Sequence, residues 1–340
     1  MSKGGAGGVT SSWPVRDDCT ISTYAAAQSY PQVVKDLRQV ALDLGYATPA
    51  WWTDHHFIKF ARARKMNKDA AIQMLRESIE WRIETGRDSW ADRLPPETVR
   101  LFEQYNPAGC VATPSGHMVT FEQQKRTDVD ALKTLIPGDP QKSEDYAIQR
   151  MLDRVERSQR KWLLASSMMT GHLILGTTLV KDLGGMGVMQ LMSVARKNIF
   201  KSVSKLLSDH YPESLCKVYV VNAPRGVGAV WSIVKQFLDA NTASKVEFLS
   251  ELSDLSEKLG DMSTMPDFLG GQVPEDVAYD AGDADLNRRP WNSPEINAAI
   301  QMLGEQQAWD MVASSWSRKI QEYPMEQRGK VWLQWASSSA

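Results

Sequence analysis

Cysteine is scarce in this sequence, whose 340 residues include only Cys19, Cys110 and Cys216. The three are scattered without a metal-ligand spacing, which is typical of free thiols in a reducing compartment. The chain also has no run of about 18 apolar residues, the length that a membrane-spanning helix needs. Its first residues, MSKGGAGGVTSSW, lack the apolar segment of a signal peptide, and Ser2 replaces the glycine of a myristoylation signal. We therefore expect a cytosolic protein that contacts membranes only peripherally.

Neither sign of charge dominates the sequence. Lys and Arg total 39 and Asp and Glu total 41, which gives a formal net charge of −2. This balance argues against a broad nucleic-acid-binding surface, so a basic binding site must be local.

Signatures of common catalytic sites are missing as well. The chain has no G-x-S-x-G elbow and no G-x-x-x-x-G-K-[ST] loop, and its five histidines form no H-E-x-x-H motif. Gly226 and Gly228 follow an apolar segment, as in a dinucleotide-binding turn, but Trp231 replaces the third glycine. We therefore expect no enzymatic activity, no catalytic residue, no metal and no cofactor. An enzyme acting on a nucleotide is the most distant alternative.

The hydrophobic pattern divides the chain into four parts. Residues 1–29 read as a flexible tail, residues 30–92 as a helical subdomain, residues 93–279 as an α/β domain, and residues 280–340 as a tryptophan-rich helical extension. In the α/β part, strands expected at 117–123, 172–183, 216–223 and 244–250 alternate with helices at 143–169, 189–208 and 228–239. Strands separated by helices of ten or more residues predict a largely parallel sheet.

Capping residues locate the helices of the N-terminal subdomain. Thr53 or Asp54 can cap one helix and Asn67 or Asp69 the next, which Gly86 should end. In the C-terminal extension, a seven-residue spacing relates Met302, Trp309 and Trp316. This pattern fits either a helix that packs on the α/β core or a helix that meets a partner or a membrane.

Four segments together resemble the CRAL-TRIO lipid-binding family, in particular its phosphatidylinositol/phosphatidylcholine transfer proteins. They are FIKFARARKMNKDAAIQMLRESIEWR, GHLILGTTLVKDLGG, YPESLCKVYVVNAPRGVGAVWSIVKQFLDANTASKVEFL and MPDFLGG, which occur in the family's order between Val33 and Gly271. The resemblance implies a mainly parallel sheet that forms the floor of an apolar pocket beneath a mobile gate helix. The gate would present Val227, Val230, Trp231, Val234, Phe237 and Leu238, and Gly226 and Gly228 would let the chain leave the sheet.

The resemblance also implies a binding site for a lipid headgroup. The positions that match the family's phosphatidylinositol contacts are Arg64, Lys65, Glu213 and Lys245, with Thr242 nearby. Lysine and arginine suit a phosphodiester, and Glu213 could accept hydrogen bonds from inositol hydroxyls. The family's contact with a second lipid, phosphatidylcholine, uses Ser-x-Thr, which corresponds here to Thr177, Thr178 and Leu179. Only Thr177 keeps a hydroxyl facing the same side, so the second lipid stays open.

The resemblance therefore implies a protein that takes a phospholipid, with phosphatidylinositol as the first candidate, from a membrane and exchanges or presents it. One alternative is a carrier for another hydrophobic ligand, such as a tocopherol, a retinoid or a sterol-like compound. A further alternative is a lipid-regulated interaction module whose protein partner docks on the C-terminal helices.

Overall fold

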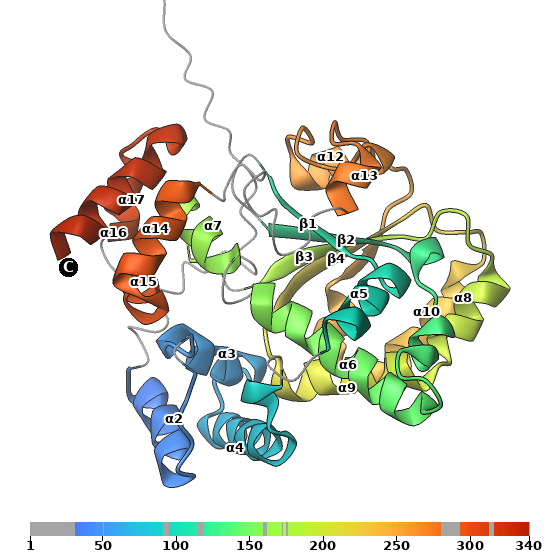
Figure 1. Ribbon diagram of the computed structural model, residues 1–340, viewed down its shortest axis with the longest axis horizontal. Coiled ribbons are helices and arrows are strands. Elements are labelled where there is room, and N and C mark those ends of the chain that lie inside the picture. Colours follow the sequence, from blue (N-terminus) through green and yellow to red (C-terminus); the bar gives the residue numbers. More distant parts are fainter. Residues whose placement is uncertain are drawn as a thin grey trace, which may run out of the picture.

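The computed structural model describes residues 31–49, 51–90, 95–113, 118–158, 162–171, 173–174, 176–279, 293–312 and 316–339 (Figure 1). The expected tail at residues 1–29 lies outside these ranges, and so do residues 280–292 of the expected C-terminal extension. Every helix of the described residues is too short or too polar to span a bilayer.

In the described residues of the N-terminal part, the α-helices are α2 (Pro31–Asp43), α3 (Asp54–Ala63) and α4 (Lys68–Thr85). Thr53 is the N-cap of α3, and the side chain of Asn67 caps α4 by accepting a hydrogen bond from the backbone N–H of Ala70. Gly86 ends α4 in the left-handed conformation, at φ 62°. Asn67 and Gly86 therefore act as expected, and Thr53 takes the expected N-cap position. An apolar cluster in which Leu37, Phe57 and Leu75 are fully buried joins the three helices.

A five-stranded sheet forms the centre of the α/β part. Its strands are β1 (Gly109–Ala112), β2 (Met118–Gln123), β3 (Thr177–Asp182), β4 (Leu215–Val221) and β5 (Val246–Phe248), in that spatial order. β1 is antiparallel to β2, and the other neighbours are parallel. The mixed α/β fold with a mainly parallel sheet is thus confirmed. β1 was not expected, because four residues that are all buried show no alternation.

Different helices cover the two faces of this sheet (Figure 1). On one face, Val119, Phe121 and Val180 pack against the short helices α12 (Asp254–Leu259), η7 (Asp267–Leu269) and α13 (Glu275–Tyr279). The other face lies toward α5 (Pro96–Tyr105), α6 (Pro140–Arg157), α8 (Val188–Ala195), α9 (Asn198–His210) and α10 (Val227–Val234). The short helices η1 (Arg87–Ser89), η3 (Gln124–Arg126), η4 (Ala131–Thr134), η6 (Lys235–Phe237) and α11 (Ala240–Ser244) complete the α/β part.

Two of the expected helices are each divided in two. The stretch 143–169 contains most of α6 and most of α7 (Leu163–Thr170). The stretch 189–208 contains α8 and α9, which separate where Lys197 adopts an extended ψ of 142°. The division matters because α9 and α6 both reach the cavity described below, whereas α8 packs beneath α10.

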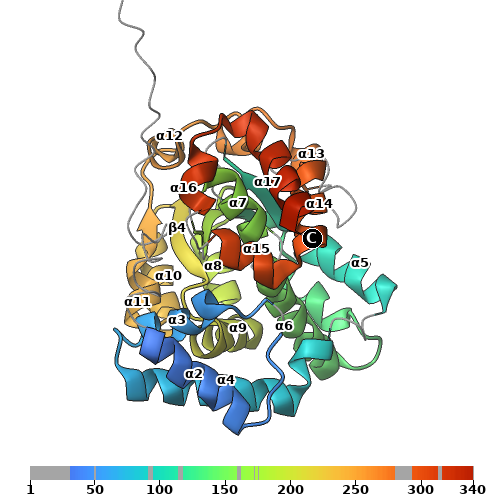
Figure 2. The same ribbon diagram turned by 90° about the vertical axis from the view of Figure 1, so that its left-hand side faces the viewer.

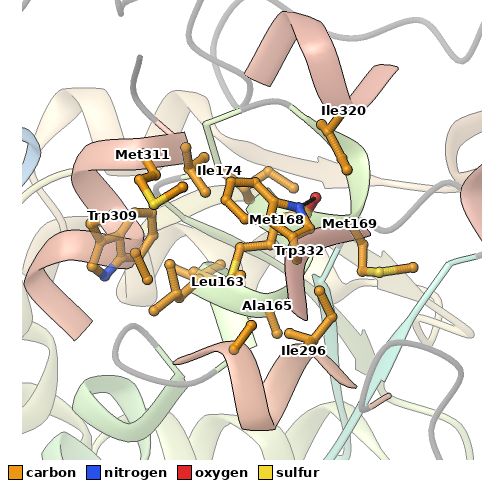
Figure 3. Packing of buried hydrophobic residues seen from close by; sticks show 14 of the residues in the cluster. Leu163, Ala165, Met168, Met169, Ile174, Ile296, Trp309, Met311, Ile320 and Trp332 are labelled. Atoms are coloured by element: carbon orange, nitrogen blue, oxygen red, sulfur yellow. Dashed lines mark hydrogen bonds between the residues drawn. The ribbon is translucent and has the colours of Figure 1, made fainter. Parts of the chain in front are cut away.

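The C-terminal helices α14 (Pro294–Leu303), α15 (Glu305–Val312), α16 (Trp316–Gln321) and α17 (Met325–Ser339) pack around α7 (Figures 2 and 3). Trp309 and Trp332 are 1% and 0% exposed, and the indole N–H of Trp332 donates to the carbonyl of Met168 at 2.7 Å. These two side chains therefore belong to the core, as the first interpretation of this segment expected. Met302 is 46% exposed, and the side chain of Trp316 lies outside what the structure describes.

Candidate functional site

A cavity of about 650 Å³ lies between the sheet and helices α6 and α9. Its floor comes from β2, β3 and the start of β4, on the face opposite to Phe121. Its middle is apolar and is lined by Val155, Leu179, Val194, Ile199, Val203 and Leu207. A volume in this range suits a small molecule or part of a larger one. Charged side chains gather at the two ends of the cavity.

The first end brings together four of the five expected headgroup residues. Arg64, Glu213, Thr242 and Lys245 all line the cavity. Lys65 does not: it follows α3 with φ 53° and is exposed. The reason is that the chain turns sharply between α3 and α4, so that adjacent basic residues point in different directions.

Lys245 and Glu213 form the centre of this end. The ammonium Nζ of Lys245 lies 3.1 Å from Glu213 Oε2 and donates to the carbonyl of Leu215 at 2.8 Å. Asn241 Nδ2 donates to the other carboxylate oxygen of Glu213 at 3.1 Å. The Arg64 guanidinium forms no ion pair with any residue in the described part of the chain, so its charge is available to an anion.

Close packing of the backbone positions Glu213 beside the sheet. Glu213 has φ 52°, in the left-handed region that non-glycine residues seldom adopt. Gly176, just before β3, lies against this turn: a Cβ there would be 3.1 Å from the Glu213 carbonyl oxygen and 2.8 Å from Cys216 Sγ. A larger residue at 176 would therefore push the turn, and with it the Glu213 carboxylate, away from β3.

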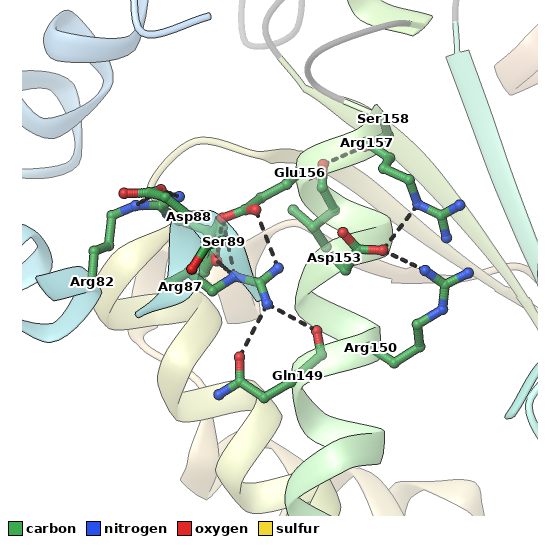
Figure 4. A network of polar contacts seen from close by, with 12 residues as sticks. Arg82, Arg87, Asp88, Ser89, Gln149, Arg150, Asp153, Glu156, Arg157 and Ser158 are labelled. Carbon is green, nitrogen blue, oxygen red and sulfur yellow. Dashed lines mark hydrogen bonds and ion pairs between the residues drawn. The ribbon is translucent and has the colours of Figure 1, made fainter. Parts of the chain in front are cut away.

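A buried network of charges anchors the same turn from the other side (Figure 4). Glu156 of α6 accepts hydrogen bonds from Arg82 Nη1 at 2.8 Å and from the hydroxyl of Tyr211 at 2.7 Å, and it also pairs with Arg87. Burial alone would raise the pKa of Glu156, but Arg82 and Arg87 hold this pKa below its usual value. Since Tyr211 precedes Glu213 by two residues, the network connects α4 and α6 to the site. Sequence reasoning missed it, because acidic and basic residues are too numerous to pair by inspection.

The second end of the cavity lies at the carboxyl ends of β2 and β3. Glu122 and Lys181 are directly opposed across the two strands, and their charged groups are 2.6 Å apart. Burial would raise the pKa of Glu122, but Lys181 and, more weakly, Arg154 lower it, so that the carboxylate is ionised. Glu103 also lines the cavity here and forms ion pairs with Arg154 and Arg150. None of these residues was singled out from the sequence.

The expected gate helix lies beside the cavity rather than across it. The residues Val227 and Val234 of α10, together with the buried Val230, belong to an apolar cluster with α8 and the β4 residues Val218 and Val220. Trp231 contacts Phe248 edge to face, with ring centroids 5.6 Å apart. Of the six expected gate residues, only Leu238 lines the cavity.

Phe237 does not line the cavity but contacts a residue that does. Its ring contacts that of Phe200 at a centroid distance of 6.5 Å, and Phe200 of α9 lines the cavity. Gly226 has φ 87° and allows the turn into α10, as expected, whereas Gly228 has ordinary helical geometry with open space around it.

Thr177 begins β3 and lines the cavity near Glu213, with 9% of its surface exposed. Its hydroxyl has no side-chain hydrogen bond to any other residue of the described ranges. Among these same residues, no group of three or more His, Cys, Asp or Glu side chains could hold a metal ion.

Comparisons with known proteins agree with this geometry. Residues 141–271 match the family model described as the CRAL/TRIO domain. Similar proteins include the phosphatidylinositol/phosphatidylcholine transfer proteins SFH9 and SFH13 of Arabidopsis thaliana, both 29% identical to this chain. The matches cover 81% and 79% of this chain but 48% and 42% of those proteins, so the chain spans about half the length of these plant relatives.

A shorter relative matches over most of its length. The Sec14 cytosolic factor of Schizosaccharomyces pombe is 26% identical, over 83% of this chain and 97% of that protein. Among solved structures, one titled "Crystal structure of Sfh5" has a TM-score of 0.49 and 18% identity, over 82% of this chain and 96% of that chain. Residues 141–271 thus match a CRAL/TRIO domain, and most of the chain is similar to proteins named as phosphatidylinositol/phosphatidylcholine transfer proteins.

Proposed function

We propose that this protein binds a membrane phospholipid in the cavity and exchanges or presents it, without covalent chemistry. The observation that carries the proposal is the cavity itself, which has an apolar middle and a charged end formed by Arg64, Glu213, Thr242 and Lys245. The names of the relatives support the same reading. We further propose that the protein is cytosolic and meets membranes transiently.

Phosphatidylinositol is the lipid that best suits the charged end. Lys245 and Arg64 supply the cations that a phosphodiester prefers, and Glu213 and Thr242 supply oxygens that can bond to inositol hydroxyls. Because Asn241 and Lys245 already hold the Glu213 carboxylate, the end is arranged before a ligand arrives. Lys65, which does not line the cavity, remains a candidate for contact with the membrane surface.

Release of the lipid requires a membrane. At about 0.8 kcal/mol per buried CH₂, two sixteen-carbon chains represent roughly 25 kcal/mol against transfer to water. The lipid must therefore pass directly between bilayer and cavity. We propose that α10, η6 and the segment around Leu238 move away from the cavity at the bilayer. Because the ring of Phe237 contacts that of Phe200, this movement would also displace α9.

Replacement of Lys245 tests the headgroup assignment. We expect Lys245→Ala to slow phosphatidylinositol transfer between vesicles by about tenfold or more, because a charged hydrogen bond to the phosphate is lost. Lys258→Ala is the matched control, since Lys258 lies on α12 and is not part of the cavity. Unchanged transfer by Lys245→Ala, with a circular dichroism spectrum like that of the wild type, would show that the headgroup binds elsewhere.

Two other readings make different predictions. A carrier of a tocopherol, a retinoid or a sterol-like compound would yield a neutral isoprenoid, rather than a phospholipid, when native mass spectrometry identifies the ligand of the purified protein. A lipid-regulated interaction module would need an exposed docking surface on the C-terminal helices. Deletion of these helices is not a clean test of that reading, because Trp309 and Trp332 are part of the core.

A further inference from the structure

The second charged end of the cavity has no role in binding phosphatidylinositol through the first end. Along β3, Thr177 lies at the first end and Lys181 at the second, and the four residue steps between them span roughly 13 Å. A headgroup held by Lys245 and Glu213 therefore leaves the groups around Lys181 unused. Yet Thr120, Glu122 and Lys181 all line the same cavity and form its floor.

The ion pair at this end retains unused hydrogen-bonding capacity. Lys181 Nζ binds Glu122 Oε2, and no further hydrogen bond joins either charged group to a residue in the described part of the chain. One carboxylate oxygen of Glu122 and two ammonium protons of Lys181 are therefore left for a ligand. Each side chain is 27% exposed although both belong to a covered sheet face, because they border the cavity.

The charges suit a headgroup that carries both a phosphate and a hydrogen-bond donor. Lys181, with Arg154 near Glu122, can bind a phosphate. Glu122 can accept a hydrogen bond from a cationic N–H. A primary ammonium group provides such N–H donors, whereas the trimethylammonium group of choline has none and is usually held against aromatic faces.

The ring of Tyr279, which lies near this end, is covered on both faces. Tyr279 lines the cavity here and donates from its hydroxyl to Gln123, the neighbour of Glu122. The Arg126 guanidinium lies over the Tyr279 ring, 4.5 Å from its centroid, and the ring of Phe268 stacks on it at a 6° interplanar angle. The ring therefore has no free face to offer to choline.

We infer that Thr120, Glu122, Lys181 and Arg154 form a second headgroup subsite, which takes a phospholipid with a primary ammonium headgroup, of the phosphatidylethanolamine class. This inference rests on the proposed phospholipid-binding function and adds the second lipid. The two lipids would occupy the cavity alternately, because both sets of acyl chains would need its apolar middle.

Competitive loading tests the subsite. The protein is incubated with vesicles that contain equal amounts of phosphatidylcholine and phosphatidylethanolamine and a minor amount of phosphatidylinositol, and the bound lipids are identified by mass spectrometry. We expect the wild type to take phosphatidylethanolamine over phosphatidylcholine by about tenfold. The double variant Glu122→Gln/Lys181→Gln removes both charges without leaving one unpaired, and it should abolish this preference while still taking phosphatidylinositol.

The double variant Lys217→Gln/Glu247→Gln is the control, because this cross-strand pair between β4 and β5 does not line the cavity. It should keep the preference of the wild type. Equal or preferential loading of phosphatidylcholine by the wild type would overturn the inference, as would an unchanged preference in the Glu122/Lys181 variant. A protein that acquires no phospholipid from any vesicle would instead refute the proposed function.

Discussion

The two faces of the central sheet are built from the same strands, but one face is closely packed and the other borders a cavity. On one face, Val119, Phe121 and Val180 are fully buried and packed against the short helices α12, η7 and α13. On the other, their neighbours Thr120, Glu122 and Lys181 border a cavity of about 650 Å³. Because side chains alternate along a strand, one residue step separates close packing from an open site.

This difference shows how the fold separates stability from binding. Protein interiors are normally filled to the density of organic crystals, so a large hollow gives up contacts that the lining residues would otherwise make. The packed face, the N-terminal helices and the C-terminal cluster must supply the stability that the cavity face does not. Changes on the two faces should therefore have very different consequences.

The largest effect is expected from a deletion on the packed face. Phe121 is fully buried, and its ring contacts those of Phe268 and Tyr279 at centroid distances of 5.8 and 5.4 Å. Phe121→Ala should lower the free energy of unfolding by about 3–5 kcal/mol, since it leaves a void among close-packed rings. Leu179→Ala, on the cavity face, should cost about 1 kcal/mol or less, because Leu179 already borders open space. Urea unfolding measures both, and equal losses would contradict the distinction between the faces.

An intermediate effect is expected from Lys59, a charged group that is buried without bordering the cavity. It is 3% exposed, and burial lowers its pKa to about 7. The unfolded chain keeps the ordinary lysine pKa, so between pH 7 and about 10 the unfolded state binds more protons than the folded state. Stability should therefore rise with pH across this window, by up to about 1.4 kcal/mol per pH unit from this group.

Lys59→Met should remove that contribution. The variant should be more stable than the wild type near pH 7, and its advantage should shrink as the pH approaches 10. Chemical denaturation at a series of pH values gives the difference curve, in which titrations shared by both proteins cancel. A difference that does not change with pH would show that Lys59 has an ordinary pKa in the folded state.

Much of the architecture could be predicted from local sequence signals. Asn67 and Gly86 bound α4 as expected, because capping needs only a side chain and the backbone next to it. The alternation of strands and helices predicted the parallel sheet. Arg64, Glu213, Thr242 and Lys245, identified by resemblance, do line one cavity, although their roles there remain predictions.

The parts that could not be predicted depend on distant partners. Glu156 contacts Arg82 across 74 positions of sequence, and Glu122 opposes Lys181 across 59, which no local pattern reports. Lys65 was expected beside Arg64, but the positive φ after α3 directs it elsewhere. The apolar character of α10 was interpreted as that of a gate helix over the cavity, but the helix packs on α8 and β4 with Val230 buried.

The smallest effect is expected from the two threonines at the start of β3, which point to opposite faces of one strand. Thr177 lines the cavity and was expected to contact a second lipid, whereas Thr178 does not line it. Valine has nearly the same shape as threonine, so Thr177→Val should change the free energy of unfolding by only about 0.5 kcal/mol. It should nevertheless slow phospholipid exchange a few-fold if the hydroxyl binds a headgroup held at the first end of the cavity, because one hydrogen bond is lost. Thr178→Val should leave exchange unchanged. A vesicle assay in which both variants behave alike would show that the hydroxyl of Thr177 does not contact the lipid, and that the cavity face acts through its charged pairs alone.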